Sequence, residues 1–211
     1  MFERIKEDIK MAKIQDPASK NSAEIFFCYP GLHAIWIHLI SHKLWKHNMF
    51  FISRIISHLN RFFTGIEIHP AVKIGRRVFI DYGMGVVIGE TAIINDDVLI
   101  YQGVVLGGTS LSTEKRHPTI GSGAVIGAGA IVIGNINVGK NAKVGACAVV
   151  LNDVSDEATV VGVPGRVVHE NREYRLDHEH QNLPDPVNET LKLIIKKQEK
   201  LESEINSLKN N

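Results

Sequence analysis

The sequence predicts an α+β protein with a helical N-terminal region, a parallel β-helix of six-residue repeats and a C-terminal helix of coiled-coil type. Three observations support this prediction. Apolar residues recur at helical spacing in the first part of the chain, aliphatic residues recur every six positions in the middle, and a heptad pattern occupies the tail. The predicted divisions are residues 1–64, 65–168 and 169–211.

The first division is expected to contain four helices. The first ends before Pro17, and Ser22 is the predicted N-cap of a short second helix. Two longer helices are expected over about 32–47 and 50–63. Because both are rich in Trp, Phe and Ile, we expect each to be buried against some other surface.

Two histidines of this region, His38 and His42, are one helical turn apart and could suit a metal ion. No carboxylate or cysteine completes a ligand set at a useful spacing. Local hydrogen bonding or a place on an amphipathic face is the favoured interpretation, and no metal site is predicted.

The central segment has aliphatic residues that step by six, often followed by a small or polar residue. A period of six does not match the 3.6 residues of a helical turn, and each glycine would cost a helix about 1 kcal/mol. The period fits a parallel β-helix, in which each unit is a short strand and a turn, and three units form a coil. The residues expected to point inward are Ile68, Ile74, Ile80 and Val86, then Ile88, Ile94, Ile100 and Leu106, and then Ile120, Ile126, Val132, Val138, Val144 and Val150.

One interruption of the period is long. Leu106 and Ile120 are fourteen positions apart, which is two units plus two residues, and the intervening GGTSLSTEKRHPT is polar. We expect a loop extruded from the column of coils. Loops held by rigid scaffolds often carry function.

The tail is expected to form a helix over about 186–208. Its apolar positions alternate spacings of four and three, which is a heptad seam with one polar member. Self-association as a coiled coil is the favoured interpretation, and packing onto the chain's own coils is the alternative. The seam consists of Val187, Leu191, Ile194, Gln198, Leu201, Ile205 and Leu208.

Composition limits the classes of function. The chain has 24 Lys+Arg and 23 Asp+Glu, so nucleic acid is not an expected partner. No apolar run reaches the roughly 20 residues that span a bilayer, and the charged start MFERIKEDIK lacks the apolar region of a signal peptide. Cys28 and Cys147 are expected to be free thiols of a cytoplasmic protein, with Cys147 a small core residue.

Six short motifs stand out along the chain. They are DPA at 16–18, GIEIHPAVKIG at 65–75, GVVIGETA at 85–92, QGVVLGGT at 102–109, KRHPTIG at 115–121 and GAGA at 127–130. These motifs resemble the hexapeptide-repeat acyltransferases and, within them, the serine O-acetyltransferase family. The resemblance covers about residues 14–168 and implies a left-handed β-helix, usually trimeric, that moves acetyl from acetyl-CoA to the hydroxyl of L-serine. The product, O-acetyl-L-serine, would feed cysteine biosynthesis.

The resemblance also implies roles for individual residues. The ammonium group of serine would be held by Asp16 and Asp81, and its carboxylate by Arg116. His117 would contact the reacting hydroxyl, and Glu67 stands where the family has an acidic partner for its catalytic histidine. The residues expected to line the pantetheine arm or meet a phosphate of CoA are Gly108, Thr109, Ala128, Ala146 and Arg166.

One position departs from the family pattern. The family reads Asp-His-Gly or Asp-His-Ala where this chain reads Asp81-Tyr82-Gly83, and that histidine is the general base. A tyrosine has a reference pKa near 10, too high for an efficient base at pH 7. Three interpretations stay open: His117 is the base while Tyr82 positions the hydroxyl, the chain is an impaired or engineered variant that binds both substrates, or the acceptor is different.

The same residues bear on other classes of function and on partners. A non-enzymatic scaffold would bind acetyl-CoA without turnover, a hexapeptide carbonic anhydrase would need three histidines on zinc, and an acetyltransferase for sugars or antibiotics fits the DPA and KRHP motifs less well. The resemblance implies a homotrimer with its active site between subunits, and a hexamer is the alternative. A complex with O-acetylserine sulfhydrylase is not expected, because that contact uses a terminal isoleucine and this sequence ends SLKNN.

Overall fold

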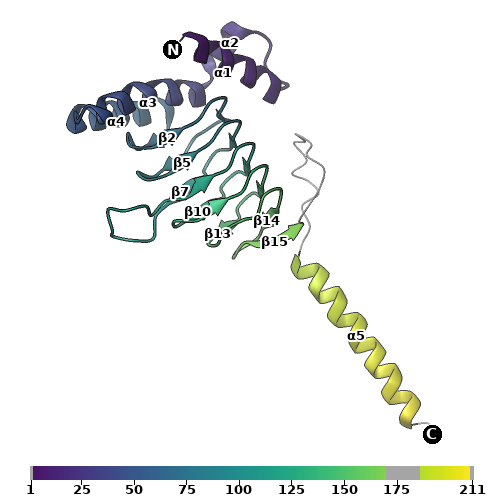
Figure 1. The fold of residues 1–211 in the computed structure, drawn as a ribbon. Coiled ribbons are helices and arrows are strands. Elements are labelled where there is room, and N and C mark those ends of the chain that lie inside the picture. The colour runs from purple at the N-terminus through teal and green to yellow at the C-terminus, as the bar shows by residue number, and fades with distance from the viewer. Residues whose placement is uncertain (1, 170–185, 210–211) are drawn as a thin grey trace.

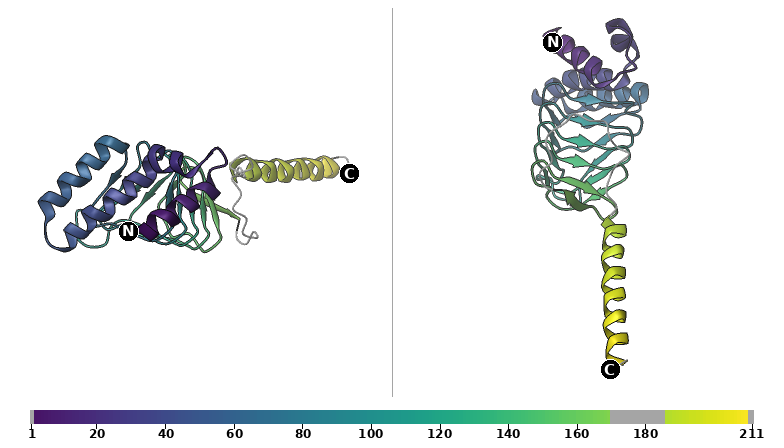
Figure 2. Two further views of the ribbon diagram at one scale, coloured as in Figure 1. Left: turned by 90° about the horizontal axis from the view of Figure 1, so that it is seen from above. Right: turned by 90° about the vertical axis from the view of Figure 1, so that its right-hand side faces the viewer.

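The structure, a computed structural model, describes residues 2–169 and 186–209 (Figure 1). Four helices lie across one end of a column of short strands, and a fifth helix extends beyond the other end (Figures 1 and 2). The helices are α1 (Phe2–Gln15), α2 (Ser22–Cys28), α3 (Pro30–Lys46), α4 (Phe50–Thr64) and α5 (Pro186–Lys209).

The column is a parallel β-helix, as the six-residue period predicts, and it is left-handed, as the family resemblance implies. From β1 to β10, each strand pairs in parallel with the strand three places further along the chain, so three strands complete one coil. The strands are β1 (Glu67–Ile68), β2 (Lys73–Ile74), β3 (Phe79–Ile80), β4 (Val87–Ile88), β5 (Ile93–Ile94), β6 (Leu99–Ile100), β7 (Val105–Gly107), β8 (Thr119–Ile120), β9 (Val125–Ile126), β10 (Ile131–Ile133), β11 (Asn137–Val138), β12 (Lys143–Val144), β13 (Val149–Val150), β14 (Thr159–Val161) and β15 (Arg166–His169).

The strands stack into three sheets, which form the three walls of a prism (Figure 2). Sheet A contains β1, β4, β7, β10 and β13, and sheet B contains β2, β5, β8 and β11. Sheet C contains β3, β6, β9, β12 and β14, with β15 added antiparallel at its end. We call the turns from sheet C to sheet A the C–A corner, and those from sheet A to sheet B the A–B corner.

The repeated aliphatic residues fill the prism, as the period of six predicts. Nearly all of them are buried, and Ile74 is half-buried. The structure adds a second inward row of smaller residues, two positions before each strand's inward aliphatic. Val86 belongs to this second row, because Ile88 takes the inward place on β4. The second row contains Val72, Val78, Val86, Ala92, Val98, Val104, Ala124, Ala130, Ala142, Ala148 and Ala158.

The N-terminal helices begin at slightly different residues from those predicted. Asn21, not Ser22, caps α2, and its side-chain oxygen accepts from the backbone amide of Glu24 at 2.9 Å. The third helix begins at Pro30, because proline is favoured at the first helical position, where its missing amide is not needed.

Within the chain, α4 does not bury its apolar residues, so the expectation that they are buried stays a prediction for this helix. Its buried residues are all polar, and large apolar residues such as Phe51, Phe62 and Phe63 are 78%, 78% and 75% exposed. The reason lies in the two surfaces against which α4 packs, which are α3 and the open edge of the first coil. Ser53 donates to the carbonyl of Ser41 in α3 at 2.6 Å, and Asn60 donates to that of Ala34 in α3 at 2.9 Å. The buried residues of α4 are Ser53, Ser57, Asn60 and Thr64.

That edge consists of backbone carbonyls, because the first coil donates its amides to the second coil and has no coil before it. Side chains of the helices supply the missing donors. Ser57 Oγ donates to the carbonyl of Ile68 at 2.8 Å, and His38 Nε2 donates to that of Val72 at 3.1 Å. His42 Nδ1 donates likewise to Pro70 at 2.7 Å. Local hydrogen bonding is therefore the role of His38 and His42.

Across residues 2–169 and 186–209, no single helix is long and apolar enough to cross a membrane, and only α2 and α3 taken together, with a bend of 64°, meet that length and composition. The division of the chain at residues 64 and 168 stays a prediction. Residues 170–185, part of the third division, lie outside the described residues.

Candidate active site

The turn that carries Asp81 and Tyr82 lies at the C–A corner. Tyr82 has a φ of 55°, in the left-handed region, and its side chain is 74% exposed. The amide of Gly83 donates to the carbonyl of Asp81 at 2.6 Å and closes the turn. This tight turn directs the Tyr82 side chain away from the prism, while Asp81 is half-buried.

Ala128 and Ala146 lie at the same corner, one above the other in successive coils. Backbone hydrogen bonds join these turns, from the amide of Gly129 to the carbonyl of Gln102 and from that of Cys147 to Ala128, both at 2.8 Å. A Cβ added to Gly103 would lie 3.4 Å from Cα of Gly129, so the turns leave little room for side chains between them. This small-residue strip could hold a thin, extended ligand.

Cys147 corrects one expectation. It is exposed, with a φ of 58°, and is not a core residue. The six-residue frame contained the signal, because Ala148 occupies the inward second-row position and Cys147 precedes it at the turn. Both cysteines are free, as expected.

Asp16 lies close to this corner through Tyr29. The Tyr29 hydroxyl donates to Asp16 Oδ2, and Asp16 Oδ1 accepts from the amide of Ala18 at 2.8 Å. Burial, the hydrogen bond to Asp16 and the charges of Asp16 and Asp81 all raise the pKa of Tyr29. Asp16 and Asp81 are therefore brought to one corner of the prism.

Sequence reasoning missed two tyrosines here. Tyr29 holds Asp16, and its ring stacks on Phe79 with centroids 6.3 Å apart. Burial raises the pKa of Tyr101, and the charges of Asp81 and Tyr82 raise it further. The strand register offered a signal for Tyr101. Because Ile80 pairs with Ile100, the residues that follow them, Asp81 and Tyr101, occupy equivalent positions in neighbouring coils.

The second group of predicted residues lies at the A–B corner, where the loop 108–118 joins β7 to β8. The Thr91 hydroxyl oxygen accepts from the amides of Arg116 and His117 at 3.0 and 3.1 Å. Thr91 Oγ1 also lies 2.8 Å from His117 Nδ1, and the Thr91 amide donates to Nδ1 at 3.2 Å. Thr91 therefore anchors the end of the loop to the coil before it.

These contacts fix the tautomer of His117. A backbone amide can only donate, so Nδ1 accepts, and a neutral imidazole must then carry its proton on Nε2. Burial, assisted by the charges of Arg116 and Lys115, lowers the pKa of His117 and favours the neutral ring. The ring packs against Gly89 and Gly108, where an added Cβ would lie 2.1 and 3.1 Å from Nε2.

Arg116 pairs with Glu90 across the same corner. Arg116 Nη2 donates to Glu90 Oε2 at 2.5 Å, and this hydrogen bond is the main reason that the pKa of Glu90 is lowered. His69, from the first coil, also lies here and accepts from the amide of Ala71 at 3.1 Å. Burial, then the charge of Arg54, lowers the pKa of His69 to about 4.

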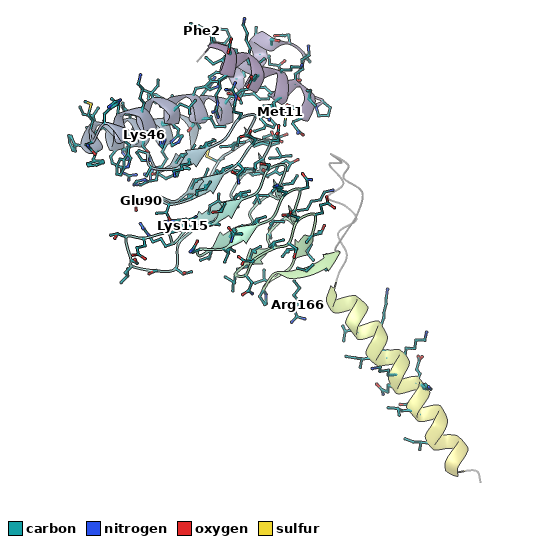
Figure 3. The ribbon with its side chains drawn as sticks, viewed as in Figure 1. Phe2, Met11, Lys46, Glu90, Lys115 and Arg166 are labelled. Carbon is teal, nitrogen blue, oxygen red and sulfur yellow. The ribbon has the colours of Figure 1, made fainter. Side chains whose placement is uncertain are left out.

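A pocket of about 310 Å³ adjoins this corner and is lined by Glu90, Thr91 and Lys115, among others. Figure 3 shows Glu90 and Lys115 close together at the base of the loop, and Arg166 near the far end of the prism. Glu67 lies on sheet A, and its partners are Arg54 at 3.6 Å and Arg61 at 3.7 Å, both on α4.

The predicted site residues of one chain are thus divided between two corners. Sheet A lies between the corners. The C–A corner gathers Asp16, Asp81, Tyr82, Ala128 and Ala146, and the A–B corner gathers Gly108, Thr109, Arg116 and His117. Within residues 2–169 and 186–209, no three His, Cys, Asp or Glu side chains are placed to hold a metal ion.

Comparison with known proteins decides the family. The chain is 54% identical to a serine acetyltransferase of Bacillus pumilus over 208 residues, which are 98% of this chain and 96% of that protein. It is 52% identical to the Bacillus subtilis serine acetyltransferase over 99% of this chain and 96% of that one. The chain belongs to the serine acetyltransferase family. No family model matches the chain.

Solved serine acetyltransferase structures share the fold. The Neisseria gonorrhoeae serine acetyltransferase superposes with a TM-score of 0.77 and 37% identity, over 79% of this chain and 67% of that one. The Brucella abortus enzyme in complex with coenzyme A gives 0.78 and 37%, over 81% and 68%. A serine acetyltransferase in complex with cysteine gives 0.79 and 40%, over 81% and 66%.

Proposed function

We propose that this chain transfers the acetyl group of acetyl-CoA to the hydroxyl of L-serine and releases CoA and O-acetyl-L-serine, a precursor for cysteine biosynthesis. Identity above 50% over nearly the whole length of Bacillus serine acetyltransferases supports the reaction. Two free, exposed cysteines suit a protein of the cytoplasm, where thiols stay reduced.

The charges of the two corners support serine as the acceptor. Asp16 and Asp81 at the C–A corner would hold an ammonium group, and Arg116 at the A–B corner would hold a carboxylate. The ends of an amino acid would then face opposite charges, and its hydroxyl would lie between Tyr82 and His117.

These corners belong to opposite edges of sheet A, so we propose that a complete site takes one corner from each of two neighbouring copies. The outer face of sheet A supports this arrangement. In register, it carries an apolar row of Val87, Val105, Ile131 and Val149. Three copies that turn this row toward a common axis would set the C–A corner of each beside the A–B corner of the next. A homotrimer follows, with a pair of trimers as the alternative.

The same cleft would receive acetyl-CoA. Gly108 and Thr109 from one copy, and the small-residue strip with Ala128 and Ala146 from the other, leave room for the narrow pantetheine arm. The exposed Arg166, further along the prism, is proposed to meet a phosphate of CoA.

The fixed tautomer of His117 is the observation that assigns its role. An imidazole with its proton on Nε2 can donate from that atom, but it cannot accept a proton there. We therefore assign His117 to hydrogen-bond donation, toward the oxyanion that forms when the serine oxygen attacks the thioester carbonyl. The first of the three interpretations, with His117 as the base, is not the one we adopt.

The proton acceptor is then proposed to be Tyr82, at the position where the family pattern has histidine. The serine Oγ–H proton passes to the ionised tyrosine as the new C–O bond forms, and cleavage of the C–S bond releases CoA, whose thiolate takes up a proton. Tyrosine is ordinarily un-ionised at pH 7. We therefore expect slow turnover near neutral pH. Glu67 pairs with Arg54 and Arg61 of α4, so a role for it as the acidic partner of residue 82 rests on the family resemblance alone.

Release of CoA, measured with serine, homoserine or no acceptor between pH 6 and 10, tests the proposal. We expect release that requires serine and rises toward pH 9–10, as a tyrosine base demands. A rising limb near pH 6–7 would instead assign a histidine base. Binding of acetyl-CoA in calorimetry without release of CoA at any pH would identify a non-catalytic scaffold.

A further inference from the structure

The outer surface of α5 carries an apolar stripe that nothing in the described part of the chain covers well. Five large aliphatic side chains of this helix are about half exposed. Most of the stability of helices in proteins comes from packing of an apolar face, so a partner for the stripe is expected. These residues are Leu191 (51%), Ile194 (54%), Ile195 (54%), Leu201 (58%) and Ile205 (49%).

The spacing of the stripe assigns heptad positions. Leu191, Gln198 and Ile205 fall at a positions, and Ile194 and Leu201 fall at d positions. Stacking of a and d residues every three and four positions is the geometry of a helix that supercoils with other helices, not one that lies on a sheet. The exposure of the stripe agrees, because α5 does not bury it on its own prism.

Charges beside the stripe favour parallel helices. Lys197 is at a g position and Glu202 is at the e position five residues later. In a parallel coiled coil, a g residue meets the following e residue of its neighbour, so Lys197 and Glu202 attract. In antiparallel helices g residues face g residues, and this attraction is lost.

Two features favour three helices over two. The first heptad has leucine at a and isoleucine at d, a combination that shifts preference away from dimers, whereas the last heptad has Ile205 at a and Leu208 at d, which by itself favours two strands. Ile195, at an e position, widens the stripe beyond the two positions that a dimer buries. In the single helix, Gln198 donates only along its own helix, to Glu202 at 3.2 Å, and its amide can turn inward as the polar residue that fixes register.

We infer that α5 helices from three copies of this chain form a parallel, in-register coiled coil, an interaction surface separate from the prism. The apolar stripe of each α5 is thus covered by the α5 helices of two other copies of the chain. This inference does not depend on the acetyl transfer, although it agrees in number with the trimer proposed for the prism.

Oxidative cross-linking of the full chain tests the inference. In a background with Cys28→Ser and Cys147→Ser, the variant Ile205→Cys places thiols at the shared axis of parallel, in-register helices. The matched control Lys200→Cys places the thiol at an outward c position of the same helix. We expect Ile205→Cys to cross-link at least about tenfold faster than Lys200→Cys. Equal rates, or no cross-linking of Ile205→Cys, would overturn the inference.

A charge exchange tests orientation independently. The melting of α5 is monitored through the cross-linking of Ile205→Cys as temperature rises. Lys197→Glu should lower the midpoint temperature of this melting, and adding Glu202→Lys should restore the midpoint. Failure of the double variant to recover would refute parallel pairing. Because Lys197 and Glu202 are remote from both corners, CoA release at saturating substrates should stay within about twofold of that of the cysteine-free background, which separates this outcome from failure of the proposed activity.

Discussion

Thr91 holds His117 through two donors to one ring nitrogen. The Thr91 amide donates to His117 Nδ1 at 3.2 Å, and the Thr91 hydroxyl, which already accepts two backbone amides, directs its proton to the same atom at 2.8 Å. The ring nitrogen that faces the glycines is left with the proton. A residue that would otherwise be ambiguous between acid, base and donor is thus set as a donor.

The Thr91 hydroxyl should therefore matter to catalysis. Thr91→Val removes the hydroxyl donor to Nδ1 and the acceptor for two amides, and we expect kcat to fall about tenfold to a hundredfold, within the range for a mispositioned donor. Thr91→Ser keeps the hydroxyl and should stay within about threefold. Steady-state CoA release measures both, and equal loss in the two variants would argue against this role.

Restoring histidine at position 82 tests the proposed base. Tyr82→His should raise kcat at pH 7 by at least about tenfold, because imidazole titrates near neutral pH. Its pH profile should lose the alkaline limb and gain one near pH 6–7. Tyr82→Phe, which keeps the ring and removes the hydroxyl, is the control and should be slower than the parent at pH 9. An unchanged kcat in Tyr82→His would show that another base is already present.

The ion pair of Arg116 and Glu90 should act on serine binding. Glu90→Gln keeps the shape of the side chain but removes the charge that orients Arg116, and we expect the KM for serine to rise about tenfold, with the KM for acetyl-CoA within twofold. The lowered pKa of Glu90 means that this carboxylate stays ionised throughout the pH range of the assay. A rise confined to the KM for acetyl-CoA would place Arg116 elsewhere.

Tyr29 is expected to position Asp16. Tyr29→Phe removes the hydroxyl that donates to Asp16 and keeps the ring that stacks on Phe79. A net hydrogen bond to a charged group is worth roughly 1.5–3 kcal/mol, so the KM for serine should rise about tenfold while kcat changes little. A purely structural role would lower the melting temperature and leave the KM for serine unchanged, which a thermal melt beside the kinetics would reveal.

Acid should destabilise the junction of helices and prism. Burial, and then the neighbouring His42, lowers the pKa of His38 to about 3. The unfolded chain binds this proton near pH 6.5, so the stability contributed by neutral His38 is present above that pH and is lost as pH falls toward 3. Between pH 7.5 and 5.5 this loss is about 1.4 kcal/mol.

Urea unfolding at these two pH values, at one protein concentration, measures that loss. His38→Leu should lower stability at pH 7.5, because the carbonyl of Val72 loses its donor. The variant should also show a smaller difference between pH 7.5 and 5.5 than the parent. An equal pH dependence in both proteins would assign the effect to other groups.

The prism could be predicted because its cause is local and repeated. Every inward aliphatic obeys the same period, so an error at one position, such as Val86, does not affect the others. The polar inner face of α4 could not be predicted in this way. Ser57 is buried against a carbonyl of the first coil, whereas Ser53 and Asn60 are buried against α3, and only the three-dimensional arrangement brings these partners together.

The candidate site shows the same contrast. Motif resemblance named Asp16, Arg116 and His117, but it did not indicate that Tyr29 holds Asp16 or that Thr91 sets the tautomer of His117. These partners come from segments that no spacing relates. Nor could the sequence alone assign each residue to its corner of the prism, because that assignment depends on how many six-residue units the loop 108–118 replaces.

A stack of coils with identical geometry has no intrinsic length, and its two terminal rungs are templates on which another chain's strands could add. Here the first rung has its acceptors occupied by hydroxyl and imidazole donors from the helices, and the last is met by β15 running in the opposite direction. Growth into fibrils is thereby blocked at both termini. The polar inner face of α4 supplies part of that protection, and the apolar residues of this helix are left on its outer face.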